Sequence, residues 1–147
     1  MPTSGTVNNL IVAATNSRPN ASSKETVDRA ERRSGKAGTG YHYLVLPSGL
    51  ITYGRPLDRP GNFIVGYNKD SIGIGLVGGK DASGKPGDNF TPAAKWALGV
   101  LLFVLSRIYT SARICGSNEL VQRNSPYFNV PQFYQEFLGA AQPSEPL

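Results

Sequence analysis

The chain has 147 residues, with 15 Lys and Arg against 10 Asp and Glu, a formal net charge of +5, and one Cys. This length fits a single domain with one hydrophobic core, and a lone Cys excludes an intramolecular disulfide. With 17 Gly and 11 Pro, the composition favours a loop-rich domain over a helical bundle. No apolar run approaches the ~20 residues that span a bilayer, and residues 1–7 lack a signal-peptide pattern. We therefore expect no membrane association and no secretory leader.

The first half of the chain combines short strands with one polar helix. Apolar and β-branched runs predict strands over residues 10–14, 41–46, 50–53 and 72–77. The turn Pro47-Ser48-Gly49 joins the second and third of these strands as a hairpin. Ser23 is a suitable N-cap for a helix over residues 24–34. The last strand is rich in Gly and apolar residues, which is typical of a central strand that is buried on both faces.

The second half contains the clearest helical pattern. Thr91 and Pro92 suit the start of a helix over residues 92–109, whose apolar positions, from Trp96 to Ile108, we expect to be largely buried. A strand over 112–116 and a closing helix over 130–138 follow. The fold class is therefore α/β (α+β), a mixed central sheet flanked by helices. We expect one domain over residues 1–139 and a C-terminal tail over 140–147.

Four sequence blocks carry a resemblance to a known family. They are GYHY at 40–43, the stretch around GRPLD that ends at 58, GYNKDSIGIGLVGG at 66–79 and GKPGDNFTPA at 84–93. In this order and spacing they resemble the zinc-dependent N-acetylmuramoyl-L-alanine amidases of the phage lysozyme and peptidoglycan recognition protein type. The resemblance implies the fold of that family. It also implies a site where zinc activates water to cleave the amide between muramic acid and the first alanine of the stem peptide.

The metal ligands that this resemblance implies are changed in the sequence. The family uses two His and a Cys, or an acidic residue in some members, and the corresponding positions here are Ala13, Ser117 and Ser125. A catalytic zinc site needs three imidazole, thiolate or carboxylate ligands, but the chain has a single His. The remaining candidate set is His42, Cys115 and Glu119, although a buried thiol is the usual explanation for such a Cys. We expect no metal and no cofactor.

Accessory positions are partly kept. By the same resemblance, Tyr41 matches a tyrosine near the metal, Arg123 stands where a Lys often stabilises the oxyanion, and Phe63 replaces a loop His. The change to Phe63 predicts an apolar lining for the former cleft. A purely structural role for Tyr41 and His42 in the hairpin is the alternative, with Arg123 as an exposed cation.

Three functions compete. The first is a catalytically inactive amidase-like domain, not an enzyme, that serves as a structural component of a phage virion, in its capsid decoration or tail. It would bind other virion proteins or itself, in the virion or the host cytoplasm.

The second is a zinc-free peptidoglycan-binding pseudoenzyme, whose basic surface suits stem-peptide carboxylates. Its ligand contacts would be Tyr43, Arg55, Phe63, Tyr67 and Asn68. The third is an active cell-wall amidase with an atypical site. Nucleic-acid binding is not expected, because the cations are scattered.

Overall fold

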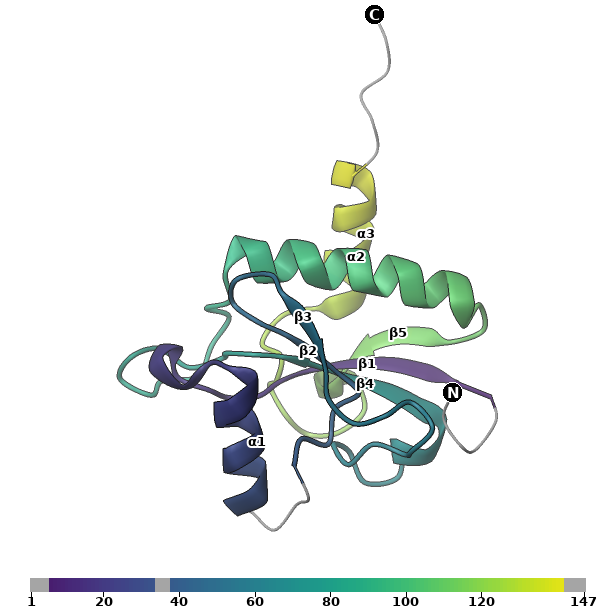
Figure 1. The fold of residues 1–147 in the computed structure, drawn as a ribbon. Coiled ribbons are helices and arrows are strands. Elements are labelled where there is room, and N and C mark those ends of the chain that lie inside the picture. Colours follow the sequence, from purple (N-terminus) through teal and green to yellow (C-terminus); the bar gives the residue numbers. More distant parts are fainter. Residues whose placement is uncertain (1–5, 34–37, 142–147) are drawn as a thin grey trace, which may run out of the picture.

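The computed structural model describes residues 6–33 and 38–141 (Figure 1). Its five strands are β1 (Asn9–Ala14), β2 (Tyr43–Val45), β3 (Ile51–Tyr53), β4 (Ser71–Leu76) and β5 (Arg113–Gly116). Its three α-helices are α1 (Lys24–Arg33), α2 (Pro92–Ile108) and α3 (Val130–Ala141). Short 3-10 turns lie at Pro19–Ala21, Asn68–Asp70 and Ser117–Glu119. The α/β fold class and the order of its elements are confirmed.

The strands form one mixed sheet in the order β3-β2-β4-β1-β5. β4 pairs in parallel with β1 and β2, and β1 pairs in parallel with β5, whereas β2 and β3 form the predicted antiparallel hairpin. Every residue of β4 is buried, as expected for a central strand. Because β1, β4 and β5 are parallel, their carboxyl ends meet at one edge of the sheet, where sites form in such folds.

Two hydrophobic layers lie on opposite faces of the sheet. On one face, Leu10 and Val12 of β1 share a cluster with Leu98 and Leu102 of α2 and with residues of α3. On the other face, Ile11 and Ala13 share a smaller cluster with Val27, the buried residue of α1. The alternation of β1 side chains explains this division. Ala13, one of the positions that resemble a metal ligand, therefore lies on the face of the sheet that α1 covers.

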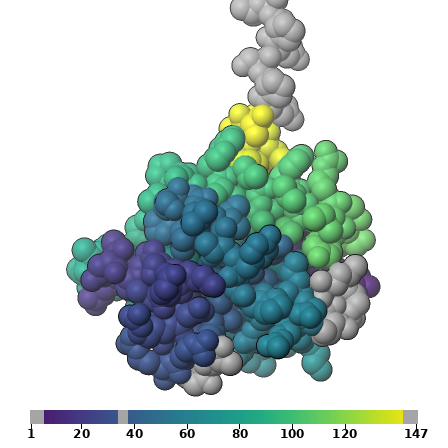
Figure 2. Space-filling view, viewed as in Figure 1, coloured from purple at the N-terminus to yellow at the C-terminus, as the bar shows by residue number. Residues whose placement is uncertain are grey.

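Two expectations about the helices need correction. Parts of α2 are exposed, because Trp96 and Ile108 are 55% and 62% accessible to solvent. Figure 2 shows α2, in green, as part of the molecular surface. The closing helix is longer than predicted and ends at Ala141, so residues 140 and 141 are helical, while the rest of the predicted tail lies outside the described residues. Within the described part of the chain, no helix combines the length and the apolar character needed to cross a membrane.

Candidate functional site

The fold brings together the three positions that resemble metal ligands. Ala13 is near the end of β1, Ser117 directly follows β5, and Ser125 lies in the loop after it. The Ser117 hydroxyl donates a hydrogen bond of 2.6 Å to the carbonyl oxygen of Ser125. The backbone N–H of Ala14 donates to Ser125 Oγ over 2.8 Å. These hydrogen bonds join the ends of β1 and β5 to the loop that carries Ser125.

A zinc ion of the family's type does not fit this cluster. Ala13, Ser117 and Ser125 are only 1%, 0% and 6% exposed. A methyl group cannot coordinate a metal, and both hydroxyls already take part in hydrogen bonds that hold the loop. Across the described residues, no three His, Cys, Asp or Glu side chains are arranged so that they can hold a metal.

His42, the first member of the candidate set His42, Cys115 and Glu119, is hydrogen bonded to two backbone groups. Its Nδ1 accepts a hydrogen bond of 3.0 Å from the N–H of Gly73, and its Nε2 lies 2.8 Å from the carbonyl oxygen of Arg59. These partners require a neutral ring with the proton on Nε2. Burial lowers the pKa of His42, and the positive charge of Arg55 acts in the same direction, against the hydrogen bond to Arg59.

The other two members of that set are also engaged elsewhere. Burial raises the pKa of the Cys115 thiol to about 11, so it stays protonated and is a poor ligand. The Glu119 carboxylate accepts hydrogen bonds from the N–H of Gly116 over 2.7 Å and from Arg113 Nη2 over 3.1 Å. Both residues are therefore structural.

Tyr41 and Phe63 form a buried aromatic pair where the resemblance places the cleft. The rings of Tyr41 and Phe63 are stacked, with centroids 5.8 Å apart, and both residues are 7% exposed. Arg123 Nη1 donates to the carbonyl oxygen of Phe63 over 3.4 Å and so ties the next loop to this stack. Burial raises the pKa of Tyr41, the charge of Glu31 adds to this rise, and Arg123 opposes it. The predicted apolar lining of an open cleft is in fact a closed core.

The residues predicted to contact a ligand do not form one site. Tyr43 is buried on the opposite face of the sheet, 5.6 Å from the ring of Tyr53. Asn68 Oδ1 accepts hydrogen bonds from the N–H groups of Phe63 and Ile64, over 2.9 and 3.0 Å, and so fixes their loop. Tyr67 packs half-buried against the α1-side cluster. Of the five predicted residues, Arg55 lines a hollow that is formed by described residues.

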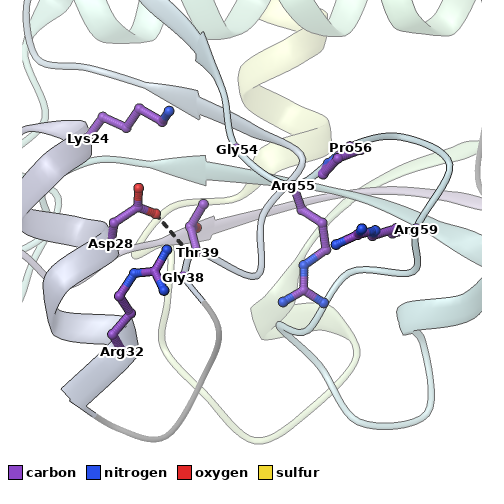
Figure 3. Close-up of a pocket in the computed structure, with 9 residues that line it drawn as sticks. All are labelled: Lys24, Asp28, Arg32, Gly38, Thr39, Gly54, Arg55, Pro56 and Arg59. Atoms are coloured by element: carbon purple, nitrogen blue, oxygen red, sulfur yellow. Dashed lines mark hydrogen bonds between the residues drawn. The ribbon is translucent and has the colours of Figure 1, made fainter.

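That hollow lies between α1 and the segment after β3 (Figure 3). Its volume is about 320 Å³. We call it the cationic hollow, and it is lined by Lys24, Asp28, Arg32, Gly38, Thr39, Gly54, Arg55, Pro56 and Arg59. Four of these side chains are cations and one is an acid. The acid is already engaged, because Asp28 Oδ1 accepts a 2.9 Å hydrogen bond from the N–H of Thr39.

The geometry of the cationic hollow suits an anion. Arg55 is half-buried, and its Nη1 donates to the carbonyl oxygen of Pro60 over 3.1 Å, which holds the guanidinium in place. Lys24 and Arg32, about two turns apart on α1, lie on the opposite wall (Figure 3). Guanidinium groups bind carboxylate and phosphate oxygens through paired hydrogen bonds. The hollow can therefore bind a ligand with one or more such groups.

Sequence reasoning identified Arg55 but missed the other cations of this site, because they come from two distant stretches. The sequence does contain a local group of cations, Arg29, Arg32 and Arg33, and of these three Arg32 lines the hollow. The fold adds Arg55 and Arg59 from the segment after the hairpin.

Comparisons with known proteins agree with the fold. Residues 3–126 match the N-acetylmuramoyl-L-alanine amidase family. The endolysin of Klebsiella phage KP32 is 35% identical over 105 residues, which are 71% of this chain and 70% of that protein. Among solved structures, the N-acetylmuramoyl-L-alanine amidase LysC from Clostridium intestinale aligns with a TM-score of 0.75 and 22% identity, over 93% of this chain and 86% of that one. The chain belongs to the N-acetylmuramoyl-L-alanine amidase family.

A second group of structural neighbours consists of recognition proteins. The ectodomain complex of the peptidoglycan recognition proteins LCa and LCx, solved with bound tracheal cytotoxin, aligns with a TM-score of 0.65 and 23% identity. This alignment covers 88% of our chain and 81% of the other. At this identity the likeness shows a shared fold.

These relatives correct one sequence-based expectation. We expected a chain that is not an enzyme, but four phage endolysins are 31–35% identical to it, which indicates an enzyme. They give no support to a structural role in a virion or to protein partners there. In this chain, Ala13, Ser117 and Ser125 occupy the positions that resemble metal ligands.

Proposed function

We propose that this protein binds bacterial peptidoglycan and that the cationic hollow holds carboxylates of the stem peptide. The observation that carries the proposal is the set of four cations around about 320 Å³, with a single acid that is already hydrogen bonded. Membership of the amidase family and the recognition-protein complex with tracheal cytotoxin support the same class of ligand. The net charge of +5 favours approach to an anionic polymer.

Arg55 and Arg59 are the residues that test the site. Removing both charges takes away charge-assisted hydrogen bonds on one wall, and each such bond is stronger than a neutral one. The variant Arg55→Gln/Arg59→Gln is expected to bind purified cell-wall sacculi about tenfold more weakly, a loss of roughly 1.4 kcal/mol. Co-sedimentation at moderate salt measures this.

A matched control separates the hollow from overall charge. Arg29→Gln/Arg33→Gln removes the same charge from exposed positions of α1 that do not line the hollow. This control should retain binding within about twofold, since general electrostatic attraction is weak and screened by salt. Equal losses of sacculus binding in both double variants would mean that binding depends on overall charge and not on the cationic hollow. No enrichment of the wild-type protein in the pellet would overturn the proposal.

Amide hydrolysis of the same polymer is the second candidate, which the endolysin relatives favour. A reaction in this chain would use groups other than the family's zinc ligands, because Ala13, Ser117 and Ser125 occupy the positions that resemble those ligands. Cleavage between muramic acid and alanine releases a new alanine amino group. Labelling of amino groups in digested sacculi, with the wild-type protein and with a heat-denatured sample, decides this candidate independently of binding.

A further inference from the structure

The outer face of α2 is apolar, although nothing in the described fold covers it. Its exposed side chains are Trp96 (55%), Val100 (39%), Phe103 (40%), Val104 (47%) and Ile108 (62%). At 100° per residue, positions 96, 100, 103 and 107 lie within about 60° of one another around the helix axis. The buried residues Leu98, Leu102 and Leu105 point to the sheet on the other side. We call these outward side chains, with Arg107, the α2 stripe.

The α2 stripe is large enough to matter. A large side chain presents on the order of 200 Å² when fully accessible, so the five exposed fractions amount to roughly 500 Å². The largest apolar patch on a monomer is about 300–600 Å² and is often functional. A standard protein interface buries about 800 Å² per partner, so the α2 stripe can supply most of its apolar centre.

The charges of the helix indicate which partner fits. α2 contains Lys95 and Arg107 but no Asp or Glu. Arg107 already lies over the ring of Phe103, with its Cζ 5.0 Å from the ring centroid. At the other end of the stripe, Trp96 contacts Phe137 of α3 on one flank, with ring centroids 4.9 Å apart, and is otherwise exposed. The stripe thus has an open aromatic ring at one end and a cation at the other.

These two ends complement each other in an antiparallel pair. We infer that two copies of this chain form a symmetric dimer through the α2 stripe. With the two-fold axis between residues 101 and 102, Trp96 faces Arg107 of the partner subunit, and Val100 faces Phe103 of the partner subunit. A guanidinium over a Trp face is a favourable cation–π contact, and a two-fold interface needs such a self-complementary surface.

The antiparallel direction also keeps the two Arg107 side chains apart. The two Arg107 residues are then about 16 Å apart along the helices, given a rise of 1.5 Å per residue. This distance exceeds the Debye length of about 8 Å at physiological salt. A parallel pair would instead place the two cations against each other. The dimer leaves the cationic hollow accessible, because that hollow lies beside α1 on the opposite face of the sheet.

The dimer is tested by sedimentation velocity on the full chain. Protein concentrations from about 5 to about 200 µM cover the range in which an interface of modest size associates. We expect a concentration-dependent dimer for the wild type. Val100→Glu/Phe103→Glu places carboxylates near the two-fold axis and should give a monomer throughout. Val65→Glu is the control, because Val65 is 92% exposed and lies far along the chain from α2, and it should dimerise like the wild type. Circular dichroism verifies that each variant is folded.

The arrangement within the dimer has its own test. Arg107→Gln removes the cation opposite Trp96 at both ends of the symmetric dimer and should weaken dimerisation by about five- to thirtyfold, as expected for the loss of two exposed cation–π contacts. Arg29→Gln, on α1, should leave the dissociation constant unchanged. An unchanged constant for Arg107→Gln would overturn the antiparallel alignment. A wild-type chain that remains monomeric at every concentration overturns the dimer itself. Co-sedimentation of such a monomer with phosphatidylcholine vesicles would instead assign the α2 stripe to a membrane surface.

Discussion

Ser117 and Ser125 are hydrogen bonded to each other: the Ser117 hydroxyl donates to the Ser125 carbonyl oxygen over 2.6 Å. The Ser125 hydroxyl in turn accepts the buried N–H of Ala14 over 2.8 Å. Two positions that resemble metal ligands thus connect the loop after β5 to the end of β1. Their side chains stabilise the edge of the sheet directly.

Replacement of Ser125 by Ala should therefore be costly. The variant leaves the N–H of Ala14 buried without its partner, and an unsatisfied buried donor costs about 1–3 kcal/mol. Urea unfolding should show this loss in the free energy of unfolding, with an unchanged slope. Ser48→Ala, at an exposed turn, is the control and should change it by less than about 0.5 kcal/mol. Equal effects for both variants would show that the bond to Ala14 is unimportant.

His42 predicts a decrease in stability at mildly acidic pH. Burial lowers its pKa in the folded protein from the ordinary 6.5, so the unfolded chain takes up a proton first. The contribution of neutral His42 is complete above about pH 6.5 and is lost as the pH falls toward the folded value, by up to about 1.4 kcal/mol per pH unit.

Measurements of unfolding between about pH 5 and pH 7.5 test this dependence on both sides of the ordinary histidine pKa. His42→Asn keeps an acceptor for the N–H of Gly73 but does not titrate. It should be less stable than the wild type at neutral pH, and its curve should be flatter between pH 5 and 6.5. Parallel curves for the two proteins would contradict a lowered pKa for His42.

Cys115 should be inert in the folded protein. With its pKa raised to about 11, only about one thiol in a thousand is ionised at pH 8, and the side chain is fully buried. A thiol reagent should react at least about 100-fold more slowly with the native protein than with the protein in concentrated denaturant. Fast labelling under native conditions would mean that β5 opens readily, in contrast to its buried position.

Much of the fold was predictable because its signals are local. The apolar runs of β1 and β4 are flanked by polar residues, and the cap at Thr91 marks the start of α2. Ala13, Ser117 and Ser125 were singled out by a resemblance, and the parallel pairing of β1 with β5 brings the first two together. These features depend on residues that are close in sequence or on family topology.

The features that were missed depend on long-range packing. The sequence indicated that Phe63 makes the cleft apolar, but not that its ring fills the space beside Tyr41. The apolar arc of α2 is too wide for one sheet to cover, and the pattern alone does not say which flank remains exposed. The cationic hollow unites residues of α1 with Arg55 and Arg59, about 30 positions later, so no local pattern predicts it.

Phe63 and Gly73 should be strongly coupled, because the aromatic ring occupies the space above the glycine in β4. A Cβ atom on Gly73 would lie 2.4 Å from Phe63 Cε1, and that ring is held between Tyr41 and His42. Gly73→Ala should therefore destabilise the protein by about 1–3 kcal/mol through overpacking. Phe63→Leu, which removes the clashing atom, should cost about 1–2 kcal/mol by itself.

The double variant distinguishes this contact from a general intolerance of β4. If the ring is the obstacle, Gly73→Ala should cost at least about 1 kcal/mol less in the Phe63→Leu background, since contacting residues are not additive. Gly87→Ala is the control, because a Cβ there meets no atom within 4 Å and should show no coupling to Phe63. If the losses in the free energy of unfolding at positions 63 and 73 are additive, Gly73 is required by β4 itself. The packing of Phe63 beside Tyr41 would then not depend on Gly73.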